Sequence, residues 1–451
     1  MAEQHGHTGK TLIVGLGKTG LSCARYLSAQ GVALAITDSR ETPPGLDALR
    51  QDYPDMALFL GGFQPEVFQA ASQLVVSPGV PVSNPLIQAA RERGTEILGD
   101  MELFARAVRA PVVAITGSNG KSTVTTLLGE MARNGGVRVA VGGNLGDPVL
   151  DLLDDVVELY VLELSSFQLE TTRSLRPRVS VVLNISADHM DRYADIDAYA
   201  EAKAGIYREA EIRVINRDDP RVAAMTEAGN TVTGFTLSEP QGTDFGRCEY
   251  EGETWLCQGL TPLMPVRDLR IPGSHNQANA LAALALGSAV GLPMTVMLET
   301  LRSFRGLAHR TQWVSDKLGL RWYNDSKGTN VGATISALLG LHGDDESRTV
   351  LIAGGDCKGA DFTALAPVVE KTTRAVILIG QDAPLLAAAL EGQVKLVSAE
   401  SMVDAVAKAR QEARAGDRVL LSPACASFDM FRNFEDRGEA FARAVEDLDH
   451  E

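Results

Sequence analysis

The sequence has few cysteines and no cluster of them. Its five cysteines are odd in number and scattered over 451 residues, at Cys23, Cys248, Cys257, Cys357 and Cys425. They show neither the short paired spacing of a zinc site nor the density of a small disulfide-stabilised domain. We therefore expect no structural metal site and no disulfide framework, which is typical of a protein of the reducing cytoplasm.

Positive charge is also scarce. The chain has 42 lysines and arginines against 58 acidic residues, a formal net charge of −16, and no block of basic residues. Binding to the phosphate backbone of nucleic acid needs clustered positive charge, so we expect no nucleic-acid partner. An anionic substrate would have to be held by local lysines, backbone amides and metal ions against a repulsive background field.

Long apolar segments are almost missing. One uncharged stretch, residues 276–298, is long enough to be considered as a membrane span. It is rich in alanine and is interrupted by polar and helix-breaking residues, namely Asn279, Gly287, Gly291 and Pro293. This pattern favours a buried helix followed by a turn. Because Met1–Lys10 is polar and has no apolar leader core, we expect a cytoplasmic protein with no membrane partner.

The length and the strand–helix pattern predict three domains. A chain of 451 residues is too long for one hydrophobic core. Short apolar strands alternate with helices, and this alternation starts again after Gly99 and after Phe304. We therefore predict three α/β domains, 1–98, 99–306 and 307–451, each with a mainly parallel sheet flanked by helices. Strands are expected at 11–14, 32–37, 74–77, 111–116, 159–163, 179–185, 320–324, 349–353, 375–379 and 418–422, and helices at 20–30, 121–134 and 330–339.

The first domain carries a nucleotide-binding pattern. Gly15–Gly20 has the sequence G-x-G-x-x-G between a predicted strand and helix, and Asp38 ends the next strand. The glycines let the backbone approach a diphosphate, and the helix N-terminus supplies oriented amides. The pattern selects a nucleotide diphosphate without specifying nicotinamide. An NAD-dependent dehydrogenase and a UDP-linked substrate are both open on this motif alone.

The second domain carries a phosphate-binding loop. Thr116–Thr123 reads T-G-S-N-G-K-S-T between a strand and a helix, with Ile115 where the standard loop has a glycine. Backbone amides of such a loop cradle phosphates, Lys121 would reach the β- and γ-phosphates, and Ser122 would bind magnesium. A glycine turn that happens to precede Lys-Ser is the alternative, but the strand, glycines, Lys-Ser and helix are all present.

Two later strands of this domain end in candidate metal ligands. Glu163 follows one strand and His189 lies just beyond another, at the sheet edge where open α/β sheets bind ligands. A carboxylate and a hydroxyl suit magnesium, and an imidazole is an unusual addition. An ordinary loop histidine is the alternative for His189. Lys203 lies in a predicted helix, where most lysines are solvated, so the residues alone give it no role.

Three polar motifs follow strands of the third domain. They are Asn324–Lys327, Gly354–Lys358 and Ser422–Ser427. Because they follow parallel strands, we expect them to converge on one rim. Their lysines, hydroxyls and glycine amides could hold a small dicarboxylate or the ATP phosphates. Simple polar turns are the alternative.

Together these motifs resemble the Mur ligase family, the amide ligases that build the peptide stem of bacterial peptidoglycan. The resemblance covers essentially the whole chain, in order, and is carried by Thr116–Thr123, Glu163–Phe167, Asp188–Asp191, Ser274–Asn276, His309–Arg310 and Asn324–Lys327. Five further segments resemble the members that add D-glutamate, namely Gly15–Gly20, Thr37–Arg40, Ser77–Gly79, Leu421–Ser427 and Arg432–Phe434. Gly328 after the Asp-Ser-Lys run and the missing P-loop glycine are small departures.

The resemblance implies ligands and site residues. UDP-N-acetylmuramoyl-L-alanine would lie against Leu16, Lys18, Thr19, Asp38, Arg40, Ser77, Pro78, Gly79 and Asn144. ATP would contact Gly117, Ser118, Asn119, Gly120, Lys121, Ser122, Thr123, Asn276, Asn279, Arg310 and Asp325. Two Mg²⁺ ions would be held by Ser122, Glu163, His189 and, if carbamylated, Lys203. D-glutamate would meet Lys327, Thr329, Lys358, Ser427 and Phe434. Of these, Lys121, His189 and Lys203 would be catalytic.

The implied reaction joins a carboxylate to an amine. The L-alanyl carboxylate attacks the γ-phosphate of ATP, and the amine of D-glutamate then displaces phosphate from the acyl phosphate. We expect a monomer that closes about a linker near 301–308. Alternatives are another amide ligase of the family, such as the L-alanine-adding enzyme or a folylpolyglutamate synthase, a dehydrogenase, and a non-catalytic P-loop protein. The dehydrogenase would leave Lys121, Glu163 and His189 without a role, and the P-loop protein would leave the third domain's polar rim unexplained.

Overall fold

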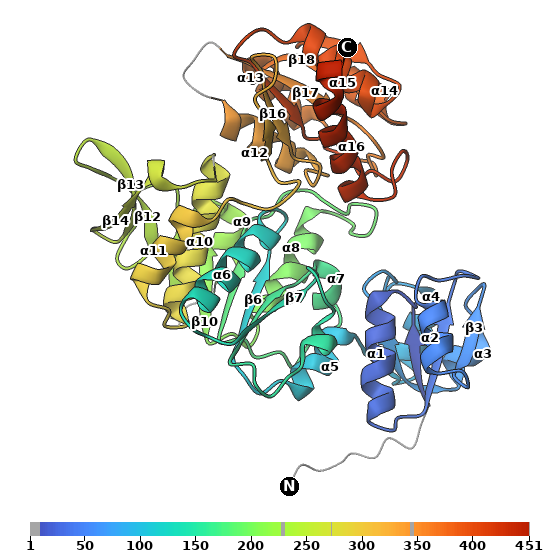
Figure 1. The fold of residues 1–451 in the computed structure, drawn as a ribbon. Coiled ribbons are helices and arrows are strands. Elements are labelled where there is room, and N and C mark those ends of the chain that lie inside the picture. Colours follow the sequence, from blue (N-terminus) through green and yellow to red (C-terminus); the bar gives the residue numbers. More distant parts are fainter. Residues whose placement is uncertain (1–9, 227–230, 272, 343–346, 451) are drawn as a thin grey trace.

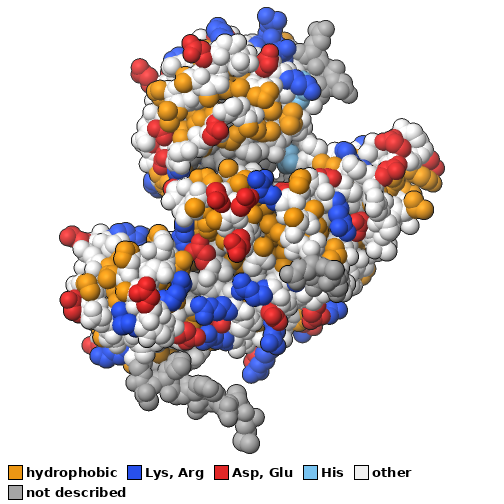
Figure 2. All heavy atoms as spheres, turned by 180° about the vertical axis from the view of Figure 1, so that it is seen from behind, with side chains coloured by type: hydrophobic (Ala, Val, Ile, Leu, Met, Phe, Trp, Pro, Cys, Tyr) orange, Lys and Arg blue, Asp and Glu red, His pale blue; other side chains and the backbone are white. Residues whose placement is uncertain are grey.

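The computed structural model describes residues 10–226, 231–271, 273–342 and 347–450. The chain folds into three α/β domains, with sheets of five, nine and six strands. The central domain contacts the other two. In the view of Figure 1 the C-terminal domain lies above it and the N-terminal domain lies to its right. Seen from behind, a groove separates the C-terminal domain from the central one, and charges of both signs are dispersed over the surface (Figure 2). The polar segment Met1–Lys10 lies, except for Lys10, outside the described residues.

The N-terminal sheet is wholly parallel, in the order β3-β2-β1-β4-β5. Its elements are β1 Lys10–Val14, α1 Lys18–Ala29, β2 Leu34–Asp38, α2 Leu46–Asp52, β3 Ala57–Leu60, α3 Pro65–Gln69, β4 Ala71–Val76, α4 Pro85–Glu92 and β5 Glu96–Leu98. The strand order reverses between β1 and β4, so the loops after these strands form a crevice, the usual ligand site of such sheets. Ser77 Oγ donates to the Gly15 carbonyl at 2.8 Å across it. A Cβ at Gly20 would lie 2.0 Å from that same carbonyl oxygen, so only glycine fits there.

The central sheet has the order β14-β13-β12-β11-β10-β9-β6-β8-β7. Strands β6 to β12 pair in parallel, and β12, β13 and β14 form an antiparallel extension. The elements are α5 Asp100–Ala107, β6 Val112–Thr116, α6 Lys121–Asn134, β7 Val139–Gly143, η1 Val149–Leu152, β8 Leu159–Glu163, α7 Ser166–Leu169, β9 Val179–Val182, α8 Ile196–Ala204, η2 Gly205–Tyr207, β10 Ile212–Asn216, α9 Pro220–Ala223, β11 Thr231–Phe235, β12 Phe245–Tyr250, β13 Glu253–Gln258, β14 Thr261–Pro265, η3 Val266–Asp268, α10 Ser274–Ala289 and α11 Met294–Ser303. Strand β6, which leads into the P-loop, is buried along its whole length between β8 and β9. That burial explains its continuous apolar sequence.

The C-terminal sheet has the order β15-β16-β20-β17-β18-β19, and only β15 is antiparallel to its neighbour. The elements are β15 Gln312–Ser315, β16 Arg321–Asn324, α12 Val331–Leu341, β17 Thr349–Ala353, η4 Thr363–Leu365, α13 Ala366–Thr372, β18 Thr373–Leu378, α14 Ala383–Leu390, β19 Lys395–Ser398, α15 Met402–Glu412, β20 Arg418–Leu421, α16 Phe434–Glu446 and η5 Asp447–His450. Strands β16, β20 and β17 are neighbours, so the loops that follow them meet at one edge of the sheet.

The three-domain α/β architecture predicted from the sequence is confirmed. The uncharged stretch 276–298 forms most of α10, a turn that contains Pro293, and the first part of α11. The sequence therefore predicted this helix and turn correctly. Among the residues that the structure describes, no helix is both long and apolar enough to cross a membrane.

The sequence predicted no disulfide framework and so gave no indication of the one disulfide that the structure contains among its described residues. Cys248 on β12 and Cys257 on β13 are joined by a disulfide. The two strands form an antiparallel hairpin, which brings residues nine positions apart into neighbouring strands. Spacing alone does not reveal this proximity, because it depends on where the hairpin turns. The other cysteines, Cys23, Cys357 and Cys425, are free and buried.

Candidate active site

A cavity of about 690 Å³, here called the N-terminal cleft, opens at the strand-order reversal of the first domain. It is lined by Gly15, Gly17, Lys18, Thr19, Asp38, Ser39, Arg40, Phe63, Ser77, Pro78, Gly79, Val80, Gly143, Asn144, Gly146, Pro148 and Gln168. Eight of the nine residues predicted to meet the UDP-linked substrate are among them. The ninth, Leu16, is fully buried, and its amide donates to Asp38 Oδ2 at 2.7 Å. Asn144 and Gln168 belong to the central domain, so the cleft spans the boundary between two domains.

Asp38 fixes the geometry of this cleft. Its Oδ1 accepts from Arg40 N at 2.9 Å and Arg40 Nε at 2.8 Å, and its Oδ2 accepts from Leu16 N and an Arg40 terminal nitrogen, both at 2.7 Å. Burial opposes ionisation, but the hydrogen bonds from Arg40 and from these amides lower the pKa of Asp38 to about 2. A carboxylate has about four acceptor positions. These four hydrogen bonds use the acceptor positions of Asp38, so this carboxylate orients Arg40. It has no free position left to accept from a ribose hydroxyl, which is the role of this acid in a dehydrogenase.

The P-loop joins β6 to α6. Gly117 and Gly120 have φ of 150° and 84°, and a Cβ at Gly120 would lie 2.4 Å from Asn279 Oδ1. Both glycines are therefore required by backbone conformation or by close approach. Lys121 Nζ donates to the carbonyls of Gly117 and Ser118, each at 2.8 Å, so this lysine lies back over its own loop. Burial lowers the pKa of Lys121.

Glu163 at the end of β8 is buried beside the P-loop. Its Oε2 accepts from Ser122 Oγ at 2.6 Å and its Oε1 from Asn144 Nδ2 at 2.7 Å. Arg310 of the C-terminal domain donates to Ser122 Oγ at 2.7 Å. Burial would raise the pKa of Glu163, but the charge of Lys121, these hydrogen bonds and the charge of Arg310 lower it. Glu163 is therefore an ionised carboxylate at the boundary between the central and C-terminal domains, and its partner Asn144 also lines the N-terminal cleft.

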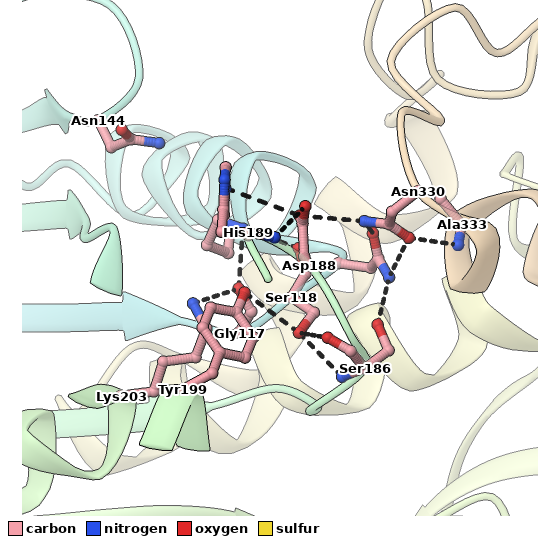
Figure 3. Close-up of polar contacts among 12 residues, drawn as sticks. Gly117, Ser118, Asn144, Ser186, Asp188, His189, Tyr199, Lys203, Asn330 and Ala333 are labelled. Carbon is pink, nitrogen blue, oxygen red and sulfur yellow. Dashed lines mark hydrogen bonds and ion pairs between the residues drawn. The ribbon is translucent and has the colours of Figure 1, made fainter. Parts of the chain in front are cut away.

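His189 lies in the loop between β9 and α8, with φ of 57°. Asp188 Oδ1 accepts from the His189 amide at 2.9 Å, and Asp188 Oδ2 lies 3.8 Å from His189 Nε2. Asn330, which caps α12, donates to Asp188 Oδ2 at 3.3 Å and to Asn119 Oδ1 at 3.2 Å, so the C-terminal domain contacts this loop and the P-loop together (Figure 3). Burial lowers the pKa of His189, although Asp188 opposes this. A neutral imidazole is the form that can bind a metal ion.

Lys203 is buried, and the expectation that a helix lysine is solvated is wrong here. Its side chain is 1% exposed, and Nζ donates to the Gly117 carbonyl at 3.0 Å (Figure 3). The ammonium also lies 4.6 Å from the centre of the Tyr199 ring. Burial, reinforced by the charge of Lys121, lowers the pKa of Lys203 well below its usual value. The available sequence signal was its position four residues after Tyr199, on the face of α8 that packs inward.

A second cavity, of about 310 Å³, lies between the P-loop, α10 and the C-terminal domain. We call it the nucleotide cavity. It collects seven of the predicted ATP-contacting residues, namely Asn119, Gly120, Thr123, Asn276, Asn279, Arg310 and Asp325. Sequence reasoning missed other lining residues, including Leu183, Asn184, Asn216, Phe235, Ile271 and His275. Most of them follow or end ordinary strands, Ile271 lies between η3 and α10, and His275 is in the first turn of α10, so only the fold brings them to this cavity.

A third cavity, of about 990 Å³, separates the central and C-terminal domains, and we call it the central cleft. One wall carries Ser122, Lys121, Glu163, Asp188 and His189. The other wall carries the five residues predicted to meet glutamate, namely Lys327, Thr329, Lys358, Ser427 and Phe434. The Lys327 ammonium lies 3.8 Å from the centre of the Phe434 ring. Burial, reinforced by the charge of Arg310, lowers the pKa of Lys327 to about 8.

The three polar motifs of the C-terminal domain converge on one rim, as predicted. Ser422 Oγ donates to Asp325 Oδ2 at 2.7 Å, and the Asp356 amide donates to the Ala426 carbonyl at 3.1 Å. Sequence reasoning missed Arg437, a buried arginine of α16 that holds two of the motifs together. Its guanidinium donates to the carbonyls of Ser326, Cys425 and Ala426.

The sequence matches three families that cover the three domains. Residues 9–99 match the family described as Mur ligase MurD-like, N-terminal domain. Residues 115–287 match the Mur ligase middle domain, and residues 309–425 match the Mur ligase, glutamate ligase domain. The chain therefore belongs to the Mur ligase family. A dehydrogenase is excluded as the class of this protein.

Curated relatives match along nearly the whole chain. A UDP-N-acetylmuramoylalanine–D-glutamate ligase of Pseudomonas putida is 54% identical over 434 residues, 96% of each chain. Ligases of the same name from Nitrosococcus oceani and Methylobacillus flagellatus are each 54% identical, and both alignments cover 97% of this chain and 96% or 97% of the relative.

Solved structures with low sequence identity have the same fold. A UDP-N-acetylmuramate–alanine ligase from Thermotoga maritima matches with a TM-score of 0.59 at 18% identity, over 98% of this chain and 99% of that one. A pseudomurein peptide ligase from Methanothermus fervidus gives the same TM-score and identity, over 98% of this chain and all of the other. These matches show that the chain shares its overall fold with both ligases.

Proposed function

We propose that this protein is an ATP-dependent ligase that adds D-glutamate to the L-alanyl carboxylate of UDP-N-acetylmuramoyl-L-alanine. The observation that carries the proposal is the identity of about 54%, along nearly the whole chain, to relatives named for this reaction. The geometry supports it, because Asn144 lines both the N-terminal cleft and the central cleft, and Arg310 lines both the nucleotide cavity and the central cleft. One chain holds all three sites, and we propose that it acts as a monomer.

The reaction needs activation of a carboxylate, because oxide is too poor a leaving group for an amine to displace. A carboxylate oxygen of the L-alanyl group attacks the γ-phosphorus of ATP, which forms an acyl phosphate and releases ADP. The amine of D-glutamate then attacks the acyl carbon, and phosphate leaves from the tetrahedral intermediate. Nucleophile and phosphoryl group are both anionic, so electrostatic stabilisation should be the largest catalytic contribution. Lys121 and the P-loop amides would supply it from this chain.

Magnesium binding is supported by the chemistry of the donors. Glu163 is an ionised carboxylate adjacent to the Ser122 hydroxyl, and a neutral His189 lines the same cleft. Among the described residues, no group of three or more His, Cys, Asp or Glu side chains is spaced to hold an ion by itself. Mg²⁺ is usually bound by one or two carboxylates plus substrate phosphates and water, and Glu163 with the adjacent Ser122 hydroxyl offers donors of this kind. Two such ions, when bound, would neutralise charge on the phosphates.

We propose that Lys203 is carbamylated. A lysine amine must be neutral to react with CO₂, which forms an N–C bond, releases one proton and leaves an anionic carbamate. Burial of Lys203 lowers its pKa and so favours the neutral amine. The family resemblance and the position of Nζ, 3.0 Å from the Gly117 carbonyl of the P-loop, support a carbamate beside the phosphate site.

D-glutamate would bind against the C-terminal wall of the central cleft. Its two carboxylates need positive charge, and Lys327 and Lys358 line this wall together with the Ser427 hydroxyl. The incoming ammonium must lose a proton before it can attack. The pKa of Lys327 is lowered to about 8, so its side chain is mostly charged at neutral pH and loses that charge in mildly alkaline solution. Its attraction for a glutamate carboxylate should therefore weaken as the pH rises above 8.

The test is phosphate release from ATP and magnesium in the presence of UDP-N-acetylmuramoyl-L-alanine and one amino acid at a time. D-glutamate, L-glutamate, L-alanine and L-lysine are supplied separately. Release that requires both the UDP-linked substrate and D-glutamate is expected. Release with another amino acid would overturn the assignment of the C-terminal wall, and no release with any of them from a folded protein would overturn the assignment of the N-terminal cleft.

A further inference from the structure

Arg192 links the N-terminal cleft to the central domain. It lies three residues after His189, in the loop that precedes α8, yet one terminal nitrogen donates to the Pro78 carbonyl of the N-terminal domain at 2.8 Å. The other terminal nitrogen donates to Glu170 Oε2 at 2.6 Å. The two side chains are only 10% and 14% exposed, so they form a mostly buried ion pair within the central domain. The hydrogen bond to Pro78 is the contact of Arg192 that crosses the domain boundary.

The same guanidinium stacks on an aromatic ring that contacts His189. Its central carbon lies 3.9 Å from the centre of the Phe167 ring. Phe167 in turn meets His189 edge to face, with ring centres 4.8 Å apart. The Tyr193 ring stacks on the Phe167 ring, with ring centres 6.2 Å apart. The Tyr193 hydroxyl donates to Glu170 Oε1 at 2.6 Å. Contacts therefore run without a break from Pro78 through Arg192 and Phe167 to His189.

We propose that Arg192 is a positioning residue that couples the seating of the UDP-linked substrate to the orientation of His189. Pro78 lines the N-terminal cleft, and His189 lines the central cleft where the phosphoryl transfer is proposed to occur. Arginine suits this role because one rigid plane can donate to two acceptors and stack on a ring at the same time. A shift of the Pro78 loop would tilt this plane and change how Phe167 packs against His189. The kinetic part of this inference rests on the proposed function.

The alternative is that Arg192 merely holds two domains together. Arg25 provides the matched control, because it also crosses this boundary, through an ion pair with Asp151 at 2.6 Å. That pair is more exposed, and its partner belongs to η1. If Arg192 only holds the two domains together, loss of either arginine should cause similar kinetic defects. If Arg192 positions His189, the kinetic defect should be confined to the Arg192 variants.

The test compares Arg192→Lys, Arg192→Met and Arg25→Met with the wild-type chain. Arg192→Lys keeps a positive charge opposite Glu170, so it is expected to unfold at nearly the wild-type temperature, but lysine cannot make all three contacts at once. For both Arg192 variants we expect kcat to fall and the KM for the UDP-linked substrate to rise, each by about tenfold, with the KM for ATP within about twofold of wild type. Arg25→Met should stay within about twofold throughout.

A second readout does not depend on activity. The ¹⁵N ring resonances of His189, assigned with a His189→Gln variant, should shift in Arg192→Lys and stay in place in Arg25→Met. Equal kinetic changes in the Arg25 and Arg192 variants, or an unshifted His189 in folded Arg192→Lys, would overturn the inference. If the wild-type chain releases no phosphate with D-glutamate, the proposed function fails, and the His189 resonances still decide whether Arg192 orients that ring.

Discussion

Replacing Lys121 by methionine separates catalysis from stability. Lys121 is the first residue of α6 and lies over the P-loop, where Nζ donates to the Gly117 and Ser118 carbonyls at 2.8 Å. In the proposed reaction the ammonium leaves these carbonyls for the phosphate oxygens of ATP. Methionine keeps most of the length of the side chain and removes the charge and all three donors.

The two effects differ in size. The loss of one preorganised donor to developing anionic charge costs about 3 kcal/mol or more, which is a fall in kcat of about a hundredfold or more. The two hydrogen bonds to carbonyls are worth about 1–3 kcal/mol together in the folded protein. Their loss is offset because burial disfavours the charged amine, as the lowered pKa of Lys121 indicates. We therefore expect a large loss of turnover with little change in thermal stability.

The assay measures ADP release with saturating substrates, together with thermal unfolding of the same preparations. Lys408→Met is the control, because Lys408 pairs with Asp404 on α15, away from the P-loop. This control should keep wild-type turnover. A Lys121→Met variant that is folded and keeps kcat within about tenfold of wild type would refute the proposed phosphate contact.

Three further predictions concern the C-terminal domain. Lys358→Ala should raise the KM for D-glutamate by about tenfold or more, because a charge-assisted contact is lost, while the KM for ATP stays unchanged; equal changes in the two constants would reject the assignment. Because the pKa of Lys327 is lowered to about 8, its positive charge is present below that pH and lost as pH rises through it. The KM for D-glutamate should therefore rise between pH 7 and pH 9, and Lys327→Arg, which stays charged, should flatten that rise; a wild-type KM that does not change with pH would exclude the role. Small-angle scattering should show a smaller radius of gyration with all ligands bound, since the central cleft must close around the reaction; no compaction would exclude closure about the linker 301–308.

The sequence predicted the fold well where strands are buried on both faces. β6, β8, β17 and β20 are short apolar runs followed by glycine or polar residues, and each was predicted within a residue or two. The antiparallel extension β12 to β14 was not predicted. Its strands carry exposed and polar residues, so no continuous apolar run marks them. The disulfide between Cys248 and Cys257 was missed for the same reason.

Site residues that belong to a contiguous motif could be predicted from the sequence, whereas those that depend on contacts with distant segments could not. The P-loop is contiguous, so Gly117 to Thr123 could be found from sequence. Lys203 and Arg437 act through burial and through contacts with distant segments. Helical spacing from Tyr199 is the one local signal for the burial of Lys203, and the distant contacts are not visible in a single sequence. Arg192 is a comparable case, because its partners Pro78 and Glu170 are 114 and 22 residues away.

The most direct test of the central claim follows oxygen from the substrate carboxylate. UDP-N-acetylmuramoyl-L-alanine labelled with ¹⁸O in both carboxylate oxygens is incubated with ATP, magnesium and D-glutamate. The ¹⁸O content of each product is then measured by mass spectrometry. An acyl phosphate predicts one ¹⁸O in the released phosphate and one in the new amide, with formation of ADP. Appearance of ¹⁸O in AMP, or an unlabelled phosphate accompanying the amide product, would contradict the account.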